Sequence, residues 1–166
     1  MKAVVLKDVT NSDDIVLEEL ETPKAKKGWI LVKILAFGMN HSELVLRVNE
    51  IRADYINKPI VPGIECVGIV ENSLDEGFEK GDLVCSLMGG LGRNFNGSYE
   101  EYAILPVQKV FHISSNLDAE HLAAIPETFF TAWGSLFECL SLQPSDILLI
   151  RGATSALGYA AMQIAT

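Results

Sequence analysis

Short apolar runs separated by polar breaks dominate residues 1–113. The runs cover residues 3–6, 15–17, 29–36, 64–70, 83–87, 98–105 and 109–113. Runs of this length, bounded by turn-forming residues, predict a β-rich region. The run 29–36 is apolar at nearly every position, which predicts a strand buried on both faces.

Two features interrupt this pattern. Glu65 places a carboxylate inside the run 64–70, which indicates either an edge strand or a functional residue. The glycine-rich stretch 88–97 lacks the Gly-Lys-Ser/Thr ending of a phosphate-binding loop. We therefore predict that this stretch is a mobile surface segment rather than a phosphate site.

The pattern becomes helical in two places. Leu44, Val48 and Ile51 recur at helical spacing after Ser42, which predicts a short helix capped by that serine. After residue 114 the pattern predicts a helix over 118–125 and a longer one from Pro126. Its apolar stripe is Phe129, Ala132, Trp133, Leu136, Phe137 and Leu140, and Thr131 lies off this stripe. The change in pattern places a domain boundary near 115–125, dividing the chain into residues 1–120 and 121–166.

The last 21 residues predict a strand, a turn and a helix. The apolar run 147–150 meets small residues and then an Ala-rich segment. Such a turn leaves backbone N–H groups free at the helix start, where a phosphate can bind. Gly152, Thr154 and Gly158 come close to the spacing of a dinucleotide fingerprint, with Gly158 one residue beyond its third position, and this alone is a weak signal. Thr154 or Ser155 is equally explained as an ordinary helix cap.

A doubly wound sheet opened by this unit would need at least two or three more strands. None follow residue 166 in this sequence. We therefore expect the 166 residues to be the front part of a larger protein.

Composition excludes several classes of partner. The chain has 13 basic and 22 acidic residues and a net charge of −9, which argues against nucleic acid and anionic membranes. With no charged-then-apolar leader and no membrane-length apolar run, we expect a cytoplasmic protein. Cys66, Cys85 and Cys139 are far apart, which argues against a disulfide framework or a structural zinc site. Each is expected to be a buried apolar residue.

Several short motifs in order resemble the medium-chain dehydrogenase/reductase superfamily, and within it the zinc-free quinone oxidoreductase-like branch. The motifs are Met1-Lys2-Ala3-Val4, Gly38-Met39-Asn40-His41-Ser42-Glu43, Pro62-Gly63-Ile64-Glu65, Gly81-Asp82-Leu83-Val84, Gly97-Ser98-Tyr99-Glu100-Glu101-Tyr102, Thr131-Ala132-Trp133 and the segment 151–158. The resemblance spans the whole chain. It implies a β-rich GroES-like catalytic domain followed by the truncated start of an α/β Rossmann domain. It also implies NADPH as the more usual cofactor and a homodimer for the full-length protein.

The resemblance also bears on zinc. In the zinc alcohol dehydrogenases the catalytic ligands match Asn40, Ile64 and a position at about Glu127. A catalytic zinc takes about three Cys, His or carboxylate ligands, which an amide and an aliphatic side chain do not replace. Residues 88–97 hold no Cys, so the structural-zinc lobe is missing as well. We therefore predict a site without metal.

The resemblance assigns roles to individual residues. Asn40 is placed against the nicotinamide and the substrate, and Thr131 beside the nicotinamide. His41 is either a proton source or an ordinary loop histidine. Glu65 is expected to hold the fold around the site. The pyrophosphate is expected on the turn formed by Gly152, Ala153, Thr154, Ser155, Ala156, Leu157 and Gly158.

Without a Lewis acid, hydrogen bonds and position must activate the hydride acceptor. This suits quinones and α,β-unsaturated carbonyls, so the first hypothesis is an NAD(P)H-dependent reductase of these compounds. The alternatives are a truncated, non-catalytic binding or interaction domain, and a zinc-dependent alcohol dehydrogenase. Because half of the nucleotide site would be missing, we expect the 166-residue chain to bind NADPH poorly and to be inactive. The substrate, and the choice between NADP and NAD, stay open.

Overall fold

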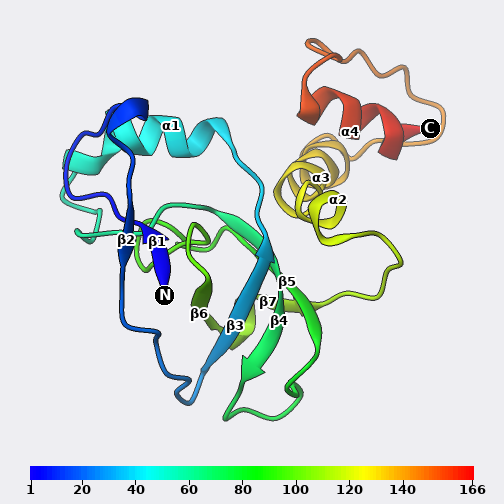
Figure 1. The fold of residues 1–166 in the computed structure, drawn as a ribbon. Coiled ribbons are helices and arrows are strands. Elements are labelled where there is room, and N and C mark those ends of the chain that lie inside the picture. The colour runs from blue at the N-terminus through cyan, green and yellow to red at the C-terminus, as the bar shows by residue number, and fades with distance from the viewer.

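The computed structural model describes residues 1–166 and is built around a five-stranded antiparallel sheet (Figure 1). The spatial order of its strands is β6-β3-β4-β5-β7. The strands are β3 (Trp29–Ala36), β4 (Glu65–Asn72), β5 (Leu83–Leu87), β6 (Tyr102–Pro106) and β7 (Val110–His112), and a separate pair joins β1 (Lys2–Val4) to β2 (Leu17–Glu19). The predicted β-rich region is confirmed, with β4 at the centre of the sheet.

The strand β3 is less buried than its sequence predicts. Its residues 30–32 are buried, but Lys33 and Leu35 are exposed. The second half therefore has one face toward solvent, as is common in antiparallel sheets. The prediction of burial on both faces is right only for the first half.

The main core lies on one face of the sheet and includes Ile30, Val32, Cys66, Val84 and Leu105. Leu91 belongs to the same core and is 1% exposed. The prediction that residues 88–97 form a surface segment is therefore wrong for Leu91, and their mobility stays a prediction. The glycines alone suggested mobility, whereas the apolar side chain among them anchors the segment to the sheet.

The chain has four α-helices: α1 (His41–Val48), α2 (Ala119–Ala123), α3 (Pro126–Trp133) and α4 (Ala156–Ala165). A π-helical segment, Gly134–Cys139, continues α3, and short 3-10 helices lie at Ser12–Asp14, Glu50–Arg52 and Val107–Lys109. Asn40, not Ser42, stands at the N-cap of α1. Pro126 begins α3 as predicted, in keeping with the preference of proline for the first helical turn.

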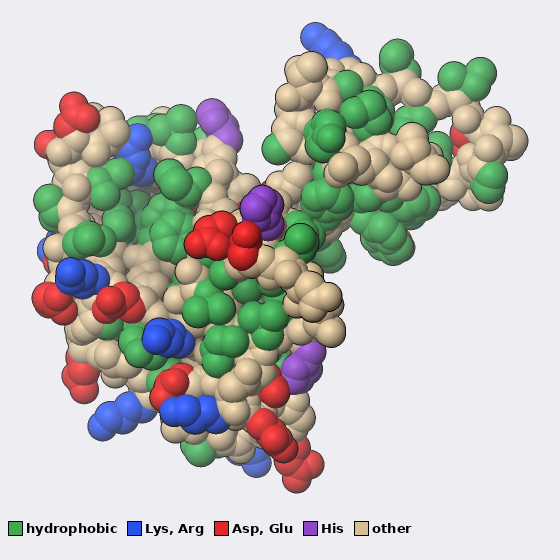
Figure 2. All heavy atoms as spheres, turned by 45° about the vertical axis from the view of Figure 1, so that its right-hand side comes forward, with side chains coloured by type: hydrophobic (Ala, Val, Ile, Leu, Met, Phe, Trp, Pro, Cys, Tyr) green, Lys and Arg blue, Asp and Glu red, His purple; other side chains and the backbone are tan.

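The helix α2 covers the sheet at β3 and β4, where Leu122 and Ala123 pack against Val67. The helices α3 and α4 pack on each other and form a second lobe beside the sheet (Figure 1). Figure 2 shows a notch between the two lobes and hydrophobic side chains gathered over the helical one.

The predicted stripe along α3 is only partly buried. Ala132 and Leu136 are buried, whereas Trp133 and Leu140 are exposed. The predicted strand over 147–150 is not formed, and Ile147 is 100% exposed. A strand is stabilised by hydrogen bonds to a neighbouring strand, and no strand lies beside this segment.

The three cysteines are free, and they differ in exposure. Cys66 is buried and Cys85 partly buried, but Cys139 is exposed, so the prediction of burial is wrong for that residue. Burial raises the pKa of the Cys66 thiol to about 12, which makes it chemically inert. None of the helices has the length and apolar character needed to cross a membrane.

Candidate functional site

Asn40 is held between the end of β3 and the start of α1. Its backbone N–H donates to Oε2 of Glu43 at 2.7 Å. Its side-chain Nδ2 donates to Oε1 of Glu65 at 2.8 Å. Together these bonds fix both the backbone and the amide plane of Asn40.

Glu65 is the centre of this arrangement. It begins β4, the central strand, and is 2% exposed, so the edge-strand explanation of this carboxylate is wrong. Gly38 makes room for it, because a Cβ at that position would lie 2.1 Å from Oε1 of Glu65. The sequence pattern alone does not reveal this, since it does not specify the order of strands in a sheet.

A second set of bonds connects Glu65 to α3. Its Oε2 accepts the backbone N–H of Glu127 at 2.8 Å, and Oε1 of Glu127 accepts the Thr131 hydroxyl at 3.0 Å. A continuous hydrogen-bonded chain therefore runs from Asn40 through Glu65 and Glu127 to Thr131. Three residues with predicted site roles are far apart in the sequence, yet the structure brings them into one site: Asn40, Glu65 and Thr131.

Two members of the site were missed as hydrogen-bonding residues. Glu43 lies three residues after Asn40, the spacing at which an acid returns to the N-cap backbone. The resemblance marks Glu127 only as the match to a zinc ligand. Glu127 lies four residues before Thr131, in the first turn of a helix, and this spacing is the sequence signal for a contact between the two side chains.

The site is acidic and buried. Burial raises the pKa of Glu65, and the nearby Glu127 and Glu43 carboxylates add to this, while the hydrogen bonds from Asn40 and Glu127 oppose it. Burial likewise raises the pKa of Glu43. No Lys, Arg or His forms an ion pair with these three carboxylates. The site therefore favours the neutral form of its buried acids more than a solvent-exposed carboxyl would.

His41 is the first residue of α1 and is exposed. Its side chain makes no hydrogen bond with the protein and does not join the chain of bonds. With Asn40 it lines a cavity of about 650 Å³ that has mainly apolar walls. Phe37 and Tyr99 stack there with ring centroids 4.4 Å apart. The role of His41 as a proton source stays a prediction.

The turn before α4 has the features needed to hold a phosphate group. Gly152 adopts φ +77°, and a Cβ on Gly158 would lie 2.3 Å from the carbonyl oxygen of Gly152. Ser155 caps the helix by accepting the N–H of Gly158 at 3.1 Å. The N–H groups of Ala156 and Leu157 make no bond within the protein. Free N–H groups at a helix start fit an anion such as the cofactor pyrophosphate.

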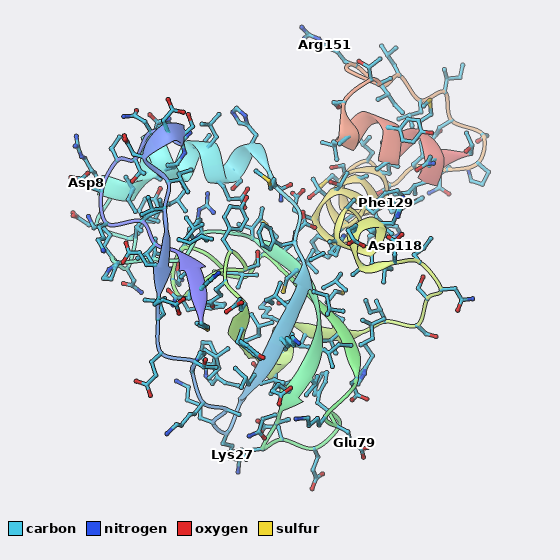
Figure 3. All side chains as sticks on the ribbon, in the orientation of Figure 1. Asp8, Lys27, Glu79, Asp118, Phe129 and Arg151 are labelled. Atoms are coloured by element: carbon cyan, nitrogen blue, oxygen red, sulfur yellow. The ribbon has the colours of Figure 1, made fainter.

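Figure 3 places Arg151, which precedes this turn, at the outer edge of the helical lobe, and Phe129 of α3 between that edge and the sheet. The remaining residues of the predicted turn, Ala153 and Thr154, lie between Gly152 and the capping serine. The turn thus lies in the helical lobe and Asn40 in the lobe of the sheet, and Glu127 of α3 joins the two lobes through its bond to Glu65.

The residues at the zinc-ligand positions do not fit a zinc ion. Asn40 offers an amide already bound to Glu65, and Ile64 offers no ligand atom. The Glu127 carboxylate is engaged by Thr131. No group of three or more His, Cys, Asp or Glu side chains is arranged to hold a metal. A tetrahedral site needs about three such ligands.

The comparisons with known proteins agree with one another. The family model described as the alcohol dehydrogenase GroES-like domain matches residues 26–115. A zinc-type alcohol dehydrogenase-like protein of Schizosaccharomyces pombe is 31% identical over 99% of this chain and 53% of its own length. The quinone oxidoreductase of Homo sapiens is 30% identical over 89% of this chain and 44% of its own.

A solved structure, that of the quinone oxidoreductase from Thermus thermophilus and its complex with NADPH, matches 99% of this chain and 50% of its own. The TM-score is 0.79 and the identity 28%. This chain thus spans about half the length of these proteins. The family match and the fold, with the GroES-like sheet at its centre, show that the chain belongs to the medium-chain dehydrogenase/reductase superfamily.

Proposed function

We propose that the full-length protein transfers a hydride from NAD(P)H to a quinone or an α,β-unsaturated carbonyl without zinc. The observation that carries this proposal is the bond between Asn40 and Glu65. An amide locked by a buried carboxylate stands where the zinc enzymes have a metal ligand. On this proposal, the site acts on its substrate through hydrogen bonds rather than through a metal ion.

The chemistry of hydride addition supports this substrate class. Addition to a conjugated carbon sends negative charge to the carbonyl oxygen, where hydrogen-bond donors stabilise it. Only one of the two Nδ2 hydrogens of Asn40 is used within the protein, so the other can donate to that oxygen.

The apolar cavity beside Asn40 supports a substrate with an apolar body. Ligand pockets of this kind have mostly hydrophobic walls and a few polar groups that orient the ligand. Here the stacked Phe37 and Tyr99 supply a flat wall, and Asn40 supplies the polar group.

The cofactor would supply the hydride when bound. We propose that Thr131 lies beside its nicotinamide and that the turn 152–158 binds its pyrophosphate, because the N–H groups of Ala156 and Leu157 are free. NADPH is the proposed form, in keeping with the complex of the Thermus thermophilus enzyme. We also propose a cytoplasmic homodimer for the full-length protein.

The proposal is tested with the full-length protein and a panel of quinones, enones and primary alcohols, each with NADPH and NADH. We expect NADPH oxidation with the conjugated carbonyls and little oxidation of the alcohols. The Asn40→Leu variant, which keeps the side-chain size and removes the amide, should lower kcat/KM by about a hundredfold, as expected for loss of a charge-stabilising donor.

Two results would reject the proposal. Alcohol oxidation that exceeds carbonyl reduction would favour a dehydrogenase of the alcohol type. NADPH binding without turnover of any compound in the panel would favour the non-catalytic binding domain.

A further inference from the structure

Glu127 makes two hydrogen bonds, one through its backbone and one through its side chain. It is the second residue of α3 and is partly buried. Its backbone N–H donates to Oε2 of Glu65, toward the sheet. Its side-chain Oε1 accepts the hydroxyl of Thr131, one turn along the helix. Glu127 thus joins Thr131 to Glu65, and Glu65 in turn holds Asn40.

The bond to Thr131 fixes that side chain. A threonine hydroxyl carries one proton, and here the proton is donated to Glu127. Because the side chain is branched at Cβ, fixing the hydroxyl also fixes the direction of the methyl group. The surface that Thr131 presents is thus set by Glu127.

The bond to Glu65 extends this control to Asn40. Glu65 has two oxygens, and one holds Glu127 while the other holds the amide of Asn40. A displacement of Glu127 would release one side of the Glu65 carboxylate, and with it the orientation of Asn40. Hydride transfer is sensitive to such displacements because the reacting atoms must be held close and aligned.

We propose that Glu127 is a positioning residue for hydride transfer. Its side chain orients Thr131 on the cofactor side, and its backbone N–H, which the side-chain variants retain, holds Glu65 and through it Asn40 on the substrate side. This inference rests on the proposed function. Glu127 acts through its neighbours and is not a catalytic residue itself.

A purely structural role makes different predictions. An acid in the first turn of a helix stabilises the helix, and so does a polar pair at spacing i, i+4. On that explanation, removing Glu127 lowers stability and leaves the affinity for the cofactor unchanged. The two roles are therefore separated by measuring cofactor binding as well as stability.

The experiment uses the full-length protein and four variants: Glu127→Ala, Glu127→Gln, Thr131→Val and the double variant Glu127→Ala/Thr131→Val. Binding is followed by the fluorescence of NADPH, and urea unfolding is measured on the same samples. We expect Glu127→Ala and Thr131→Val each to raise the Kd about tenfold, as for loss of one hydrogen bond. The double variant should be no worse than either one. Glu127→Gln should bind like wild type, because the Gln oxygen accepts the same hydroxyl.

Glu120→Ala is the matched control, since Glu120 is an exposed acid in the first turn of α2 and makes no hydrogen bond through its side chain. It should leave the Kd unchanged. Fully additive losses in the double variant would overturn the positioning role. So would unchanged NADPH binding in Glu127→Ala, provided that the wild type binds and turns over. A wild-type protein that neither binds NADPH nor turns over a substrate would overturn the proposed function together with this inference.

Discussion

Replacing Gly38 by Ala introduces one methyl group at the tightest point of the site. The added Cβ would lie 2.1 Å from Oε1 of Glu65, 2.7 Å from its Cδ and 3.1 Å from the carbonyl oxygen of Ala123. Ordinary contacts begin at 3.4 Å, so the carboxylate oxygen must move by more than about 1 Å. Glu65 is 2% exposed and both of its oxygens accept hydrogen bonds, so this movement acts against those two bonds.

The displacement breaks the two bonds that Glu65 accepts, from Asn40 at 2.8 Å and from Glu127 at 2.8 Å. A bond to a charged group contributes about 1.5–3 kcal/mol. We therefore expect Gly38→Ala to lower the free energy of unfolding by about 3–6 kcal/mol, measured by urea denaturation.

Two further variants test whether the loss of stability comes from the contact between residue 38 and Glu65. Gly134→Ala is the control, because its added Cβ meets no atom within 4 Å and the residue has helical dihedral angles, so it should be neutral or slightly stabilising. In a Glu65→Ala background, Gly38→Ala should cost less than about 1 kcal/mol, since the displaced group is gone. If Gly38→Ala lowers the free energy of unfolding equally in the wild type and in the Glu65→Ala variant, the loss does not come from displacing Glu65.

Three further predictions concern other parts of the chain. Glu100 is buried, its Oε2 has no partner, and burial raises its pKa to about 8, so the folded state keeps a proton that the unfolded chain loses. The free energy of unfolding should therefore fall by at most ~5 kcal/mol as pH rises from about 4.5 to about 8. In urea titrations, Glu100→Gln should remove most of this dependence of stability on pH. An unchanged dependence would show that Glu100 is not its source. Gly158→Ala should raise the Kd for NADPH at least about tenfold in the full-length protein, because a Cβ there lies 2.3 Å from the carbonyl oxygen of Gly152; binding at wild-type strength would show that the turn does not hold the cofactor. Ser155→Ala should lower the free energy of unfolding by about 1 kcal/mol through loss of the helix cap, and calorimetry that shows no loss would contradict this role.

The β-rich half was predictable because each strand carries a local signal. The bounds of β3 and β5 coincide with the apolar runs 29–36 and 83–87. The run 147–150 carries the same signal and forms no strand, because pairing depends on a neighbour that the local pattern does not supply.

The site was predictable in part, and chiefly through the resemblance. The motifs singled out Asn40, Glu65 and Thr131, which the structure joins through hydrogen bonds. Glu127 as the connecting residue was not predictable, because its bond to Glu65 uses a backbone N–H and not a side chain. The central position of Glu65 likewise follows from strand order, which residue types do not encode.

We propose that Asn40, held by Glu65, takes the place of a metal in this site. To test this, the full-length protein is treated with a chelator, its zinc is counted by mass spectrometry and NADPH oxidation with an enone is measured in the same sample. We expect substoichiometric zinc and a rate that chelation leaves unchanged. Stoichiometric zinc whose removal abolishes the rate, and whose return restores it, would show instead that a metal carries the reaction.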